Sequence, residues 1–323
     1  MNPIEGTIDS QSKSETAAAA AAGVKAGVAA TDEAALHPTF HNPRKLRLFK
    51  ERFFYGSILL ATLCALGFLF YLLFSIGAQG WEHLDMDFIN NFPSRKPAQA
   101  GFKSAIWGTV WLGGMTLIFS VFFGVGAALY LQELSPKNRF TSSIQVSIST
   151  LAGVPSIIYG MLGLGIFVRF LGMGRSVLAG SLTLSLLIIP VIIIASREAL
   201  KAVPDSTRMA SFALGATRWQ TVRDHVLPAA VPGIATGVIL AMARAMGEAA
   251  PLILLGALTY VAFVPSGPLD SFTAMPIQIF NWASRPQEAF HNLASTGIIV
   301  LLGFLMLCNS VAIFIRLRWG RKL

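Results

Sequence analysis

Composition and hydropathy patterning predict an all-α, polytopic membrane protein with six transmembrane helices. Hydrophobic residues make up 54% of the 323 positions and charged residues 13%, about half the charged share of a typical soluble domain. The apolar residues gather in stretches of about 20, the length that an α-helix needs to cross a bilayer. Lysine and arginine flank these stretches, so the net charge of +9 indicates membrane boundaries rather than a nucleic-acid surface.

The first fifty residues differ from the rest and predict a disordered cytoplasmic tail ahead of a membrane domain at residues 51–323. Residues 11–35 are rich in alanine, serine, threonine and charged residues and show no apolar periodicity. Such a segment cannot bury enough apolar surface to order itself. No apolar stretch lies close to Met1, so we expect no secretory signal peptide. A basic collar ends the tail and consists of Arg44, Lys45, Arg47, Lys50 and Arg52.

Six apolar stretches have the length of a transmembrane helix. They cover residues 54–78, 106–131, 148–170, 177–195, 231–258 and 296–317. In the third, Gly153 and Pro155 indicate close helix packing or a bend, and a short turn at residues 172–174 joins it to the fourth. In the fifth, Pro251 predicts a kink, because proline has no N–H for the hydrogen-bond ladder of the helix.

The distribution of lysine and arginine predicts that both termini are cytoplasmic. Sixteen of these residues fall in the collar, in segments 137–139 and 197–223 and at the C-terminal end, whereas six fall in the opposite loops. The side of a membrane protein that is rich in lysine and arginine is the cytoplasmic side. We therefore expect a multi-pass protein of a bacterial inner membrane, in contact with lipid and without a nucleic-acid partner.

The fifth apolar stretch contains a single charged pair. Arg244 and Glu248 are the only Asp, Glu, Lys or Arg residues between Asp224 and Asp270, and residues four apart lie on one face of a helix. A charged side chain at the centre of a membrane helix costs about 2.5–3.5 kcal/mol on insertion scales, and such residues usually line a cavity or a substrate path. We expect this pair to line a transport pathway. The alternative is an ion pair that only positions the helix.

The longest internal segment on the basic side, residues 197–227, predicts two short helices. Pro204 marks the start of the first, and the two residues that follow are available as N-caps. Gly215 suits the left-handed residue that ends this helix, and Thr217 can cap a second helix that stops before Pro228. Both helices carry apolar and aromatic residues that need a partner surface, either the membrane or another protein.

The same segment resembles the EAA loop of ABC importer permeases. That motif reads Glu-Ala-Ala, three residues, Gly, nine residues, Ile, one residue, Leu-Pro, and its spacing recurs here with Met for Glu, Ser for the second Ala and His for Ile. The positions that we carry over are Met209, Ala210, Ser211, Gly215, Leu227 and Pro228. In that family the loop docks into a cleft of a separate ATPase subunit and passes its motion to the membrane helices. The resemblance therefore implies an ATPase-coupling loop at about residues 197–227.

The resemblance extends from about residue 54 to the C-terminus and is greatest to the A-type permease subunit of phosphate importers. It is carried by residues 151–160, 243–252 and 273–278, and the Gly-Glu-Ala-Ala-Pro-Leu sequence in the second of these favours the A-type subunit. It implies a type I importer fold and transport by alternating access. It also implies three kinds of partner: ATP-binding subunits, a second permease subunit of C type and an extracytoplasmic phosphate-binding protein.

Phosphate transport would give the charged pair two distinct roles. Arginine has a planar guanidinium that matches phosphate oxygens and stays charged where it is poorly solvated. Arg244 would therefore attract the anion. Glu248 would hold the arginine and limit its affinity, so that the anion can leave.

Other functions stay open on the residues alone. A secondary transporter usually carries an internal repeat with matched broken helices, and a lipid-modifying enzyme needs a cluster of polar catalytic residues near one interface; neither pattern is found. An importer for molybdate, sulfate or another oxyanion fits the membrane sequence equally well. The chain contains no Gly-Lys-Ser/Thr, so we expect ATP and Mg²⁺ on a partner ATPase. The chain itself is then non-catalytic, without a metal or cofactor.

Overall fold

The computed structural model describes residues 44–136, 138–257 and 260–320, and the regular elements in these ranges are helices. The predicted disordered tail lies almost wholly outside the described residues, as does Leu258 at the end of the fifth predicted span. Five helices are long and apolar enough to cross a membrane: Lys50–His83, Lys103–Leu134, Val177–Lys201, Arg218–Met246 and Glu288–Arg318. A bent pair, Arg139–Leu151 with Ser156–Phe170, makes a sixth span when counted as one. The all-α prediction with six spans is confirmed in this form.

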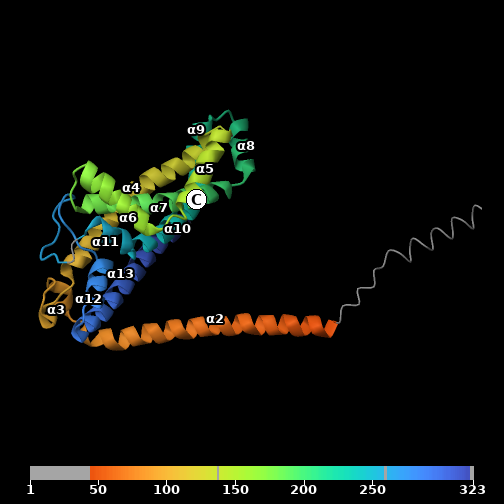
Figure 1. Cartoon of the computed structure of the whole chain (residues 1–323). Coiled ribbons are helices and arrows are strands. Elements are labelled where there is room, and N and C mark those ends of the chain that lie inside the picture. The colour runs from red at the N-terminus through yellow and green to blue at the C-terminus, as the bar shows by residue number, and fades with distance from the viewer. Residues whose placement is uncertain (1–43, 137, 258–259, 321–323) are drawn as a thin grey trace, which may run out of the picture. The chain divides into compact units, whose positions relative to one another are not determined.

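The helices follow one another as Figure 1 shows. The longer α-helices are α2 (Arg44–Gly80), α4 (Lys103–Leu129), α5 (Arg139–Leu151), α7 (Val177–Lys201), α10 (Leu227–Met246) and α13 (Glu288–Gly320). The shorter ones are α3 (Met86–Asn90), α6 (Ser156–Gly163), α8 (Asp205–Ala213), α9 (Arg218–Thr221), α11 (Ala250–Leu255) and α12 (Met275–Ala283). Three π-helical segments, η3 (Tyr130–Leu134), η4 (Leu164–Phe170) and η5 (Val222–Val226), continue α4, α6 and α9.

The chain divides into two compact units, at residues 1–69 and 70–323. In the first unit, α2 is predominantly apolar on all sides after Arg52, and its side chains from residue 53 to residue 69 are exposed. A helix that is hydrophobic on all sides requires an apolar environment. This part of the chain is therefore suited to contact with lipid or with another membrane subunit.

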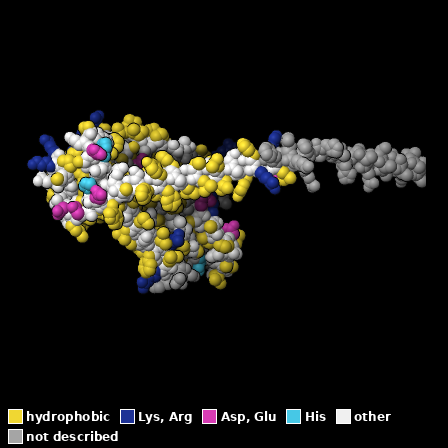
Figure 2. Space-filling model, turned by 90° about the horizontal axis from the view of Figure 1, so that it is seen from below, with side chains coloured by type: hydrophobic (Ala, Val, Ile, Leu, Met, Phe, Trp, Pro, Cys, Tyr) yellow, Lys and Arg dark blue, Asp and Glu magenta, His cyan; other side chains and the backbone are white. Residues whose placement is uncertain are grey.

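In the second unit, α7 forms the centre of the core. Val177, Ile188 and Ile192 are fully buried, and α4 and α10 pack against α7 on different sides. A second apolar cluster, around Phe102 and Trp282, joins the start of α4 to α12 and α13, with ring centroids 5.4 Å apart. Figure 2 shows hydrophobic side chains over much of the visible surface, with charged side chains gathered toward its ends. This distribution is that of a membrane domain.

Small residues allow α10 to approach α7 closely. A Cβ atom added to Gly237 would lie 2.5 Å from the Cβ of Ala195, and one added to Gly233 would lie 2.8 Å from the Cβ of Ala199. Lipid chains are as apolar as the side chains of the helices, so membrane helices associate through close packing of this kind rather than through exclusion of water. The contacts also set α7 and α10 antiparallel, because the residue number rises along one helix as it falls along the other.

The third predicted span, 148–170, is bent rather than straight. Helix α5 ends at Leu151, α6 begins at Ser156, and the two axes differ by 102°. Pro155 causes the break, since it cannot donate to the carbonyl of Leu151 and disfavours a helical residue before it. The Tyr159 hydroxyl donates to that carbonyl instead, at 2.8 Å. The sequence prediction of close packing or a bend is confirmed in both respects, because Gly160 also lies against Pro251.

The fifth predicted span, 231–258, differs more from the structure. The helical segment begins at Arg218, ends at Met246 and is followed by a break, after which α11 starts at Ala250. The predicted kink at Pro251 is therefore wrong, because a full break takes its place. Proline at position 251 removes the N–H that would bond the carbonyl of Gly247 and crowds that carbonyl. The helix consequently ends one turn before the proline.

A loop at residues 266–271 covers the N-terminus of α7. The backbone N–H groups of Val177 and Leu178 donate to the carbonyls of Asp270 and Pro268, at 3.0 and 2.8 Å. These are two of the N–H groups that have no partner within their own helix. The Asp270 carboxylate holds the loop by accepting from the N–H and hydroxyl of Ser266 and from the N–H of Gly267. These hydrogen bonds, those of Ser266 first, lower the pKa of Asp270.

We expect Gly237→Ala to destabilise the fold, although alanine favours a helix by about 0.5–1 kcal/mol over glycine. The added methyl group would overlap the side chain of Ala195, and overpacking of this kind costs about 1–3 kcal/mol. Gly126→Ala is the matched control, because no atom lies within 4 Å of its added Cβ. Thermal unfolding of the two variants in detergent tests this. A Gly237 variant as stable as the control would contradict the close packing of α7 and α10.

We expect the 266–271 loop to loosen at acid pH. A carboxyl group with a lowered pKa in the folded state stabilises the fold above its unfolded pKa, and this contribution disappears as the pH falls through the folded pKa. Asp270→Asn should reproduce the acid state at neutral pH. Hydrogen exchange at the Val177 and Leu178 amides should accelerate in both cases, whereas Asp87→Asn, at an exposed position of α3, should leave it unchanged. Equal exchange in the Asp270 variant and the wild type would exclude a role for the carboxylate.

Candidate functional site

The charged pair of the fifth span lies at the break between α10 and α11. Arg244 is in the last turn of α10, and Glu248 follows the helix end, where its N–H donates to the carbonyl of Ala245 at 3.2 Å. The prediction that both side chains lie on one helical face is wrong, because the helix does not continue through Glu248. Within the described residues, neither side chain makes an ion pair or a hydrogen bond.

Arg244 lies on a face of α10 that no described residue covers. Ala241 and Ala245 are buried in the α7 core, whereas Leu240 is 68% exposed and Arg244 is exposed. Glu248 is half-buried. A charged group on the surface of an apolar membrane helix is costly unless it faces water or a partner. The site therefore requires an aqueous space or another subunit on this side of α10.

The 197–227 loop has the predicted helix–glycine–helix layout. Helix α8 ends at Ala213, and Gly215 adopts the left-handed conformation with φ = 81°. Thr217 caps α9 through a reciprocal capping box with Gln220. Two details differ from the prediction. Neither Asp205 nor Ser206 caps α8, whose N-cap is Pro204, and the second helix does not stop before Pro228 but continues through η5 into α10.

The loop exposes an apolar surface and buries its polar contacts. Met209, Phe212, Leu214 and Trp219 are exposed by 69%, 43%, 89% and 55%. Ala210 and Gly215 are exposed as well, whereas Leu227 and Pro228 are half-buried at the start of α10. Ser211 is 3% exposed, and its hydroxyl bonds that of Thr221 across the two helices at 2.9 Å. The predicted coupling residues therefore belong to one structured loop, with Met209 and its apolar neighbours on the outside.

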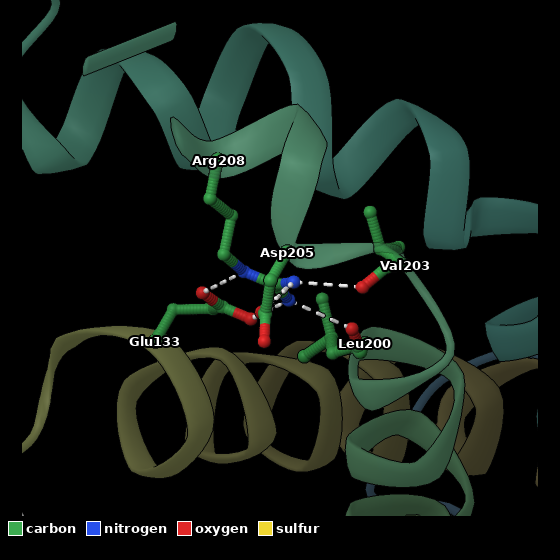
Figure 3. Close-up of polar contacts among 5 residues, drawn as sticks. All are labelled: Glu133, Leu200, Val203, Asp205 and Arg208. Atoms are coloured by element: carbon green, nitrogen blue, oxygen red, sulfur yellow. Dashed lines mark hydrogen bonds and ion pairs between the residues drawn. The ribbon is translucent and has the colours of Figure 1, made fainter. Parts of the chain in front are cut away.

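A partly buried arginine fixes α8 to the ends of α4 and α7. We call this set of residues the Arg208 cluster, and Figure 3 shows its members: Glu133, Leu200, Val203, Asp205 and Arg208. Arg208 meets the Glu133 carboxylate of η3 with two nitrogens, Nη2 at 2.7 Å and Nε at 3.2 Å. Its Nη1 donates to the carbonyl of Val203 and to Asp205, and its Nη2 donates to the carbonyl of Leu200.

The Arg208–Glu133 pair is largely shielded from solvent, whereas the side chain of Asp205 is 90% exposed. The side chains of Arg208 and Glu133 are 16% and 8% exposed. A bidentate contact of this kind is directional, and the hydrogen bonds that Arg208 donates to the Glu133 carboxylate raise the pKa of Arg208 above its ordinary value. Helix α8 is thus tied to two membrane helices through one side chain.

Residues 120–321 match the model of a protein family described as binding-protein-dependent transport system inner membrane component. The match covers well over half of the chain and includes α5 to α13 together with the 197–227 loop. The chain belongs to this family. It is an ABC transporter permease, a multi-pass protein of the inner membrane.

Several curated permeases are similar to it. PstA 1 of Mycobacterium tuberculosis H37Rv, a phosphate transport system permease protein, is 31% identical over 272 residues, which cover 82% of this chain and 85% of the relative. PstA of Haemophilus influenzae is 29% identical over 271 residues, covering 83% and 93%. The probable ABC transporter permease protein YqgI of Bacillus subtilis is 32% identical over 222 residues, covering 68% and 75%.

Solved structures share the fold. A subunit of the bacterial ABC transporter that imports the acidic polysaccharide alginate superimposes with a TM-score of 0.61 at 17% identity, over 85% of this chain and 99% of that one. A chain of the MetNI methionine transporter in an inward-facing conformation gives 0.57 at 18% identity, over 67% and 94%. The type I importer fold predicted for the permease is thereby confirmed.

The sequence does not reveal the Arg208 cluster. Arg208 and Glu133 are 75 residues apart, and neither stands in a motif that predicts contact with the other. The one signal is composition: Glu133 is an acidic residue close to the basic end of its span, where lysine and arginine predominate. That signal indicates a partner but does not identify it.

We expect Arg208→Ala to release α8 from the membrane helices of the permease. Removing one partner of a buried ion pair costs on the order of 3 kcal/mol, and here the carbonyls of Leu200 and Val203 also lose their donor. Hydrogen exchange of the α8 amides should accelerate strongly. Lys201→Ala is the control, because it removes a solvent-exposed pair with Glu198, which is worth at most about 1 kcal/mol. Equal exchange in both variants would show that the cluster does not fix the loop.

Proposed function

We propose that the chain is a transmembrane subunit of an ATP-driven phosphate importer and forms part of the pathway for the anion. The observation that carries the proposal is an unpartnered arginine, Arg244, on an apolar span of a permease whose relatives include phosphate permeases of several bacteria. Those relatives are similar over more than four fifths of this chain. An importer for molybdate or sulfate is the second candidate within the family.

The chemistry of Arg244 suits an oxyanion in transit. Its guanidinium has five N–H donors and makes no hydrogen bond to the described part of the chain, so it can offer all of them to phosphate. Glu248 lies just beyond the helix end. Its carboxylate would repel the bound anion and so weaken the binding. A site with one attracting and one repelling group binds weakly enough to release its substrate.

The pathway would run along the exposed face of α10. We infer that a second permease subunit of C type covers this face, so that Arg244 lies between the two subunits. The break after Gly247 leaves backbone groups outside the helix ladder, and irregular backbone at membrane depth is tolerated where it lines a cavity or is buried in protein. α10 therefore brings an arginine and a broken backbone to the same point.

The 197–227 loop would couple this pathway to ATP hydrolysis on a separate chain. Its exposed apolar residues, Met209, Phe212, Leu214 and Trp219, suit a cleft of an ATPase subunit. The Arg208 cluster would pass a displacement of α8 to α4 and α7, because Arg208 is bonded to residues at the ends of both helices. ATP and Mg²⁺ belong to that partner, and a phosphate-binding protein delivers the anion on the opposite side. Both termini and the loop lie on the cytoplasmic side.

We expect cells that lack the chain to regain labelled phosphate uptake with the wild type and to lose it, by tenfold or more, with Arg244→Ala. Arg244→Lys keeps the charge but not the planar fork and should restore part of the uptake. Glu248→Gln should bind the anion more tightly, so the apparent KM should fall. Assembly is checked by co-purification of the ATPase. Molybdate and sulfate uptake are measured alongside, and phosphate uptake that does not depend on the chain would exclude the phosphate assignment.

A further inference from the structure

A polar groove lies between α5 and the end of α7 that leads into the 197–227 loop. It consists of two adjoining cavities of about 360 and 550 Å³. Four residues line both cavities, and we use the term polar groove for the space between them: Ser142, Gln145, Arg197 and Lys201. These cavities are large enough for a phosphate group and do not include Arg244.

The sequence of α5 makes one wall of this groove hydrophilic. Ser142, Gln145 and Ser149 are spaced three and four residues apart, so they lie on one face of the helix. The hydroxyls of Ser149 and Thr150 donate to carbonyls of their own helix. Ser142 and Gln145 make no such side-chain bond to the described residues. They remain free to donate to a ligand.

The other wall carries an arginine without a partner. Arg197 Nε is buried from solvent and has no hydrogen-bond acceptor among the described residues, and no described group accepts from the rest of its guanidinium. Lys201 differs, because its ammonium meets the Glu198 carboxylate at 2.7 Å. A buried donor without an acceptor costs about 1–3 kcal/mol. The net charge of the groove is therefore that of Arg197, and its free donors converge on one space.

We propose that the polar groove is a second oxyanion site of the permease, with Arg197 as its principal ligand and Gln145 and Ser142 as hydrogen-bond donors. The ligand class is a phosphate group, either free inorganic phosphate or the headgroup of an anionic lipid. Guanidinium, amide and hydroxyl donors together match the several acceptor oxygens of such a group. For free phosphate the proposal rests on the transport function given above.

The packing of α7 against α10 gives the distance between the two sites along the helices. Ala195 lies opposite Gly237 and Ala199 opposite Gly233, so Arg197 is level with residue 235. Arg244 is nine residues further along α10, about 13 Å at 1.5 Å per residue. Along the helix axes, Arg197 is therefore on the side of Arg244 that leads toward the 197–227 loop.

The site can be tested by cysteine chemistry on the purified full chain, without reference to transport. Cys64 and Cys308 are replaced by serine, and Ser149→Cys places a thiol on the wall of the larger cavity. The rates of modification by an anionic and a cationic methanethiosulfonate are compared, with and without inorganic phosphate. In the wild-type groove the anionic reagent should be favoured, and phosphate should slow both reactions.

Two variants with opposite expected effects make the test specific. Arg197→Gln should lower the ratio of anionic to cationic rates by about fivefold and abolish protection by phosphate. Glu198→Gln should raise the ratio, because it removes the one carboxylate that lines the cavity. Arg169→Gln is the control, since it removes an exposed positive charge at the other end of the bent span. An Arg197 variant with an unchanged ratio would overturn the proposal.

The source of the ligand is decided by the surrounding lipid. Protection by phosphate in lipid-free micelles supports a free anion. Protection by the lipid itself, seen only in nanodiscs that contain phosphatidylglycerol, supports a lipid headgroup. Protection by neither overturns the site. These outcomes do not depend on uptake, so failure of the phosphate assignment in cells and failure of the groove are distinguishable. If both hold, Arg197→Gln should also reduce phosphate uptake.

Discussion

The structure of the permease depends on how closely α10 can approach α7. Lipid chains provide little hydrophobic drive for one helix to leave them and join another, so the gain comes from contact between surfaces that fit. Gly233 and Gly237 bring α10 against Ala199 and Ala195, and this contact fixes the rotation of α10 about its axis. Ala241 and Ala245 then face the core, and Arg244 faces outward. Arg244 is seven residues after Gly237 and so lies close to the glycine face by helical spacing. Its exposure therefore shows that the described residues do not cover this face at the C-terminal end of α10.

Two helix breaks, each followed by a short helix, also determine the packing of the permease. Pro155 ends α5 and Pro251 ends α10, and the segments that follow, α6 and α11, pack against each other through Gly160 and Pro251. Breaks are tolerated at membrane depth only where protein satisfies the freed backbone. The Tyr159 hydroxyl does this for the carbonyl of Leu151. Only the break after Met246 places irregular backbone next to Arg244.

The sequence predicts features that depend on neighbours in the chain and misses those that depend on distant ones. Gly215 in the left-handed conformation, the Thr217 cap and the start of α7 at Val177 are correct, because each follows from the chemistry of a few adjacent residues. The common face expected for Arg244 and Glu248 is wrong, because a proline seven residues after the arginine overrides helical spacing. The Arg208 cluster and the polar groove join residues more than 50 positions apart, and no local pattern contains them.

Arg197 in the last part of α7, Arg208 in α8 and Arg244 at the C-terminal end of α10 differ in what their guanidinium groups bind. This difference suggests which of them serve the fold and which serve a ligand. Arg208 makes five hydrogen bonds within its cluster, which equals the number of its N–H donors. It has nothing left to offer a ligand, so its role is to hold α8. Arg197 and Arg244 make none with the described residues. Arg197 lines the polar groove, and the side chain of Arg244 is exposed. A cation whose donors are all used stabilises the fold, whereas one whose donors are free in an apolar protein is unstable there without a ligand. On this ground we propose that the two free arginines lie on the path of the anion, whereas Arg208 holds α8 in place.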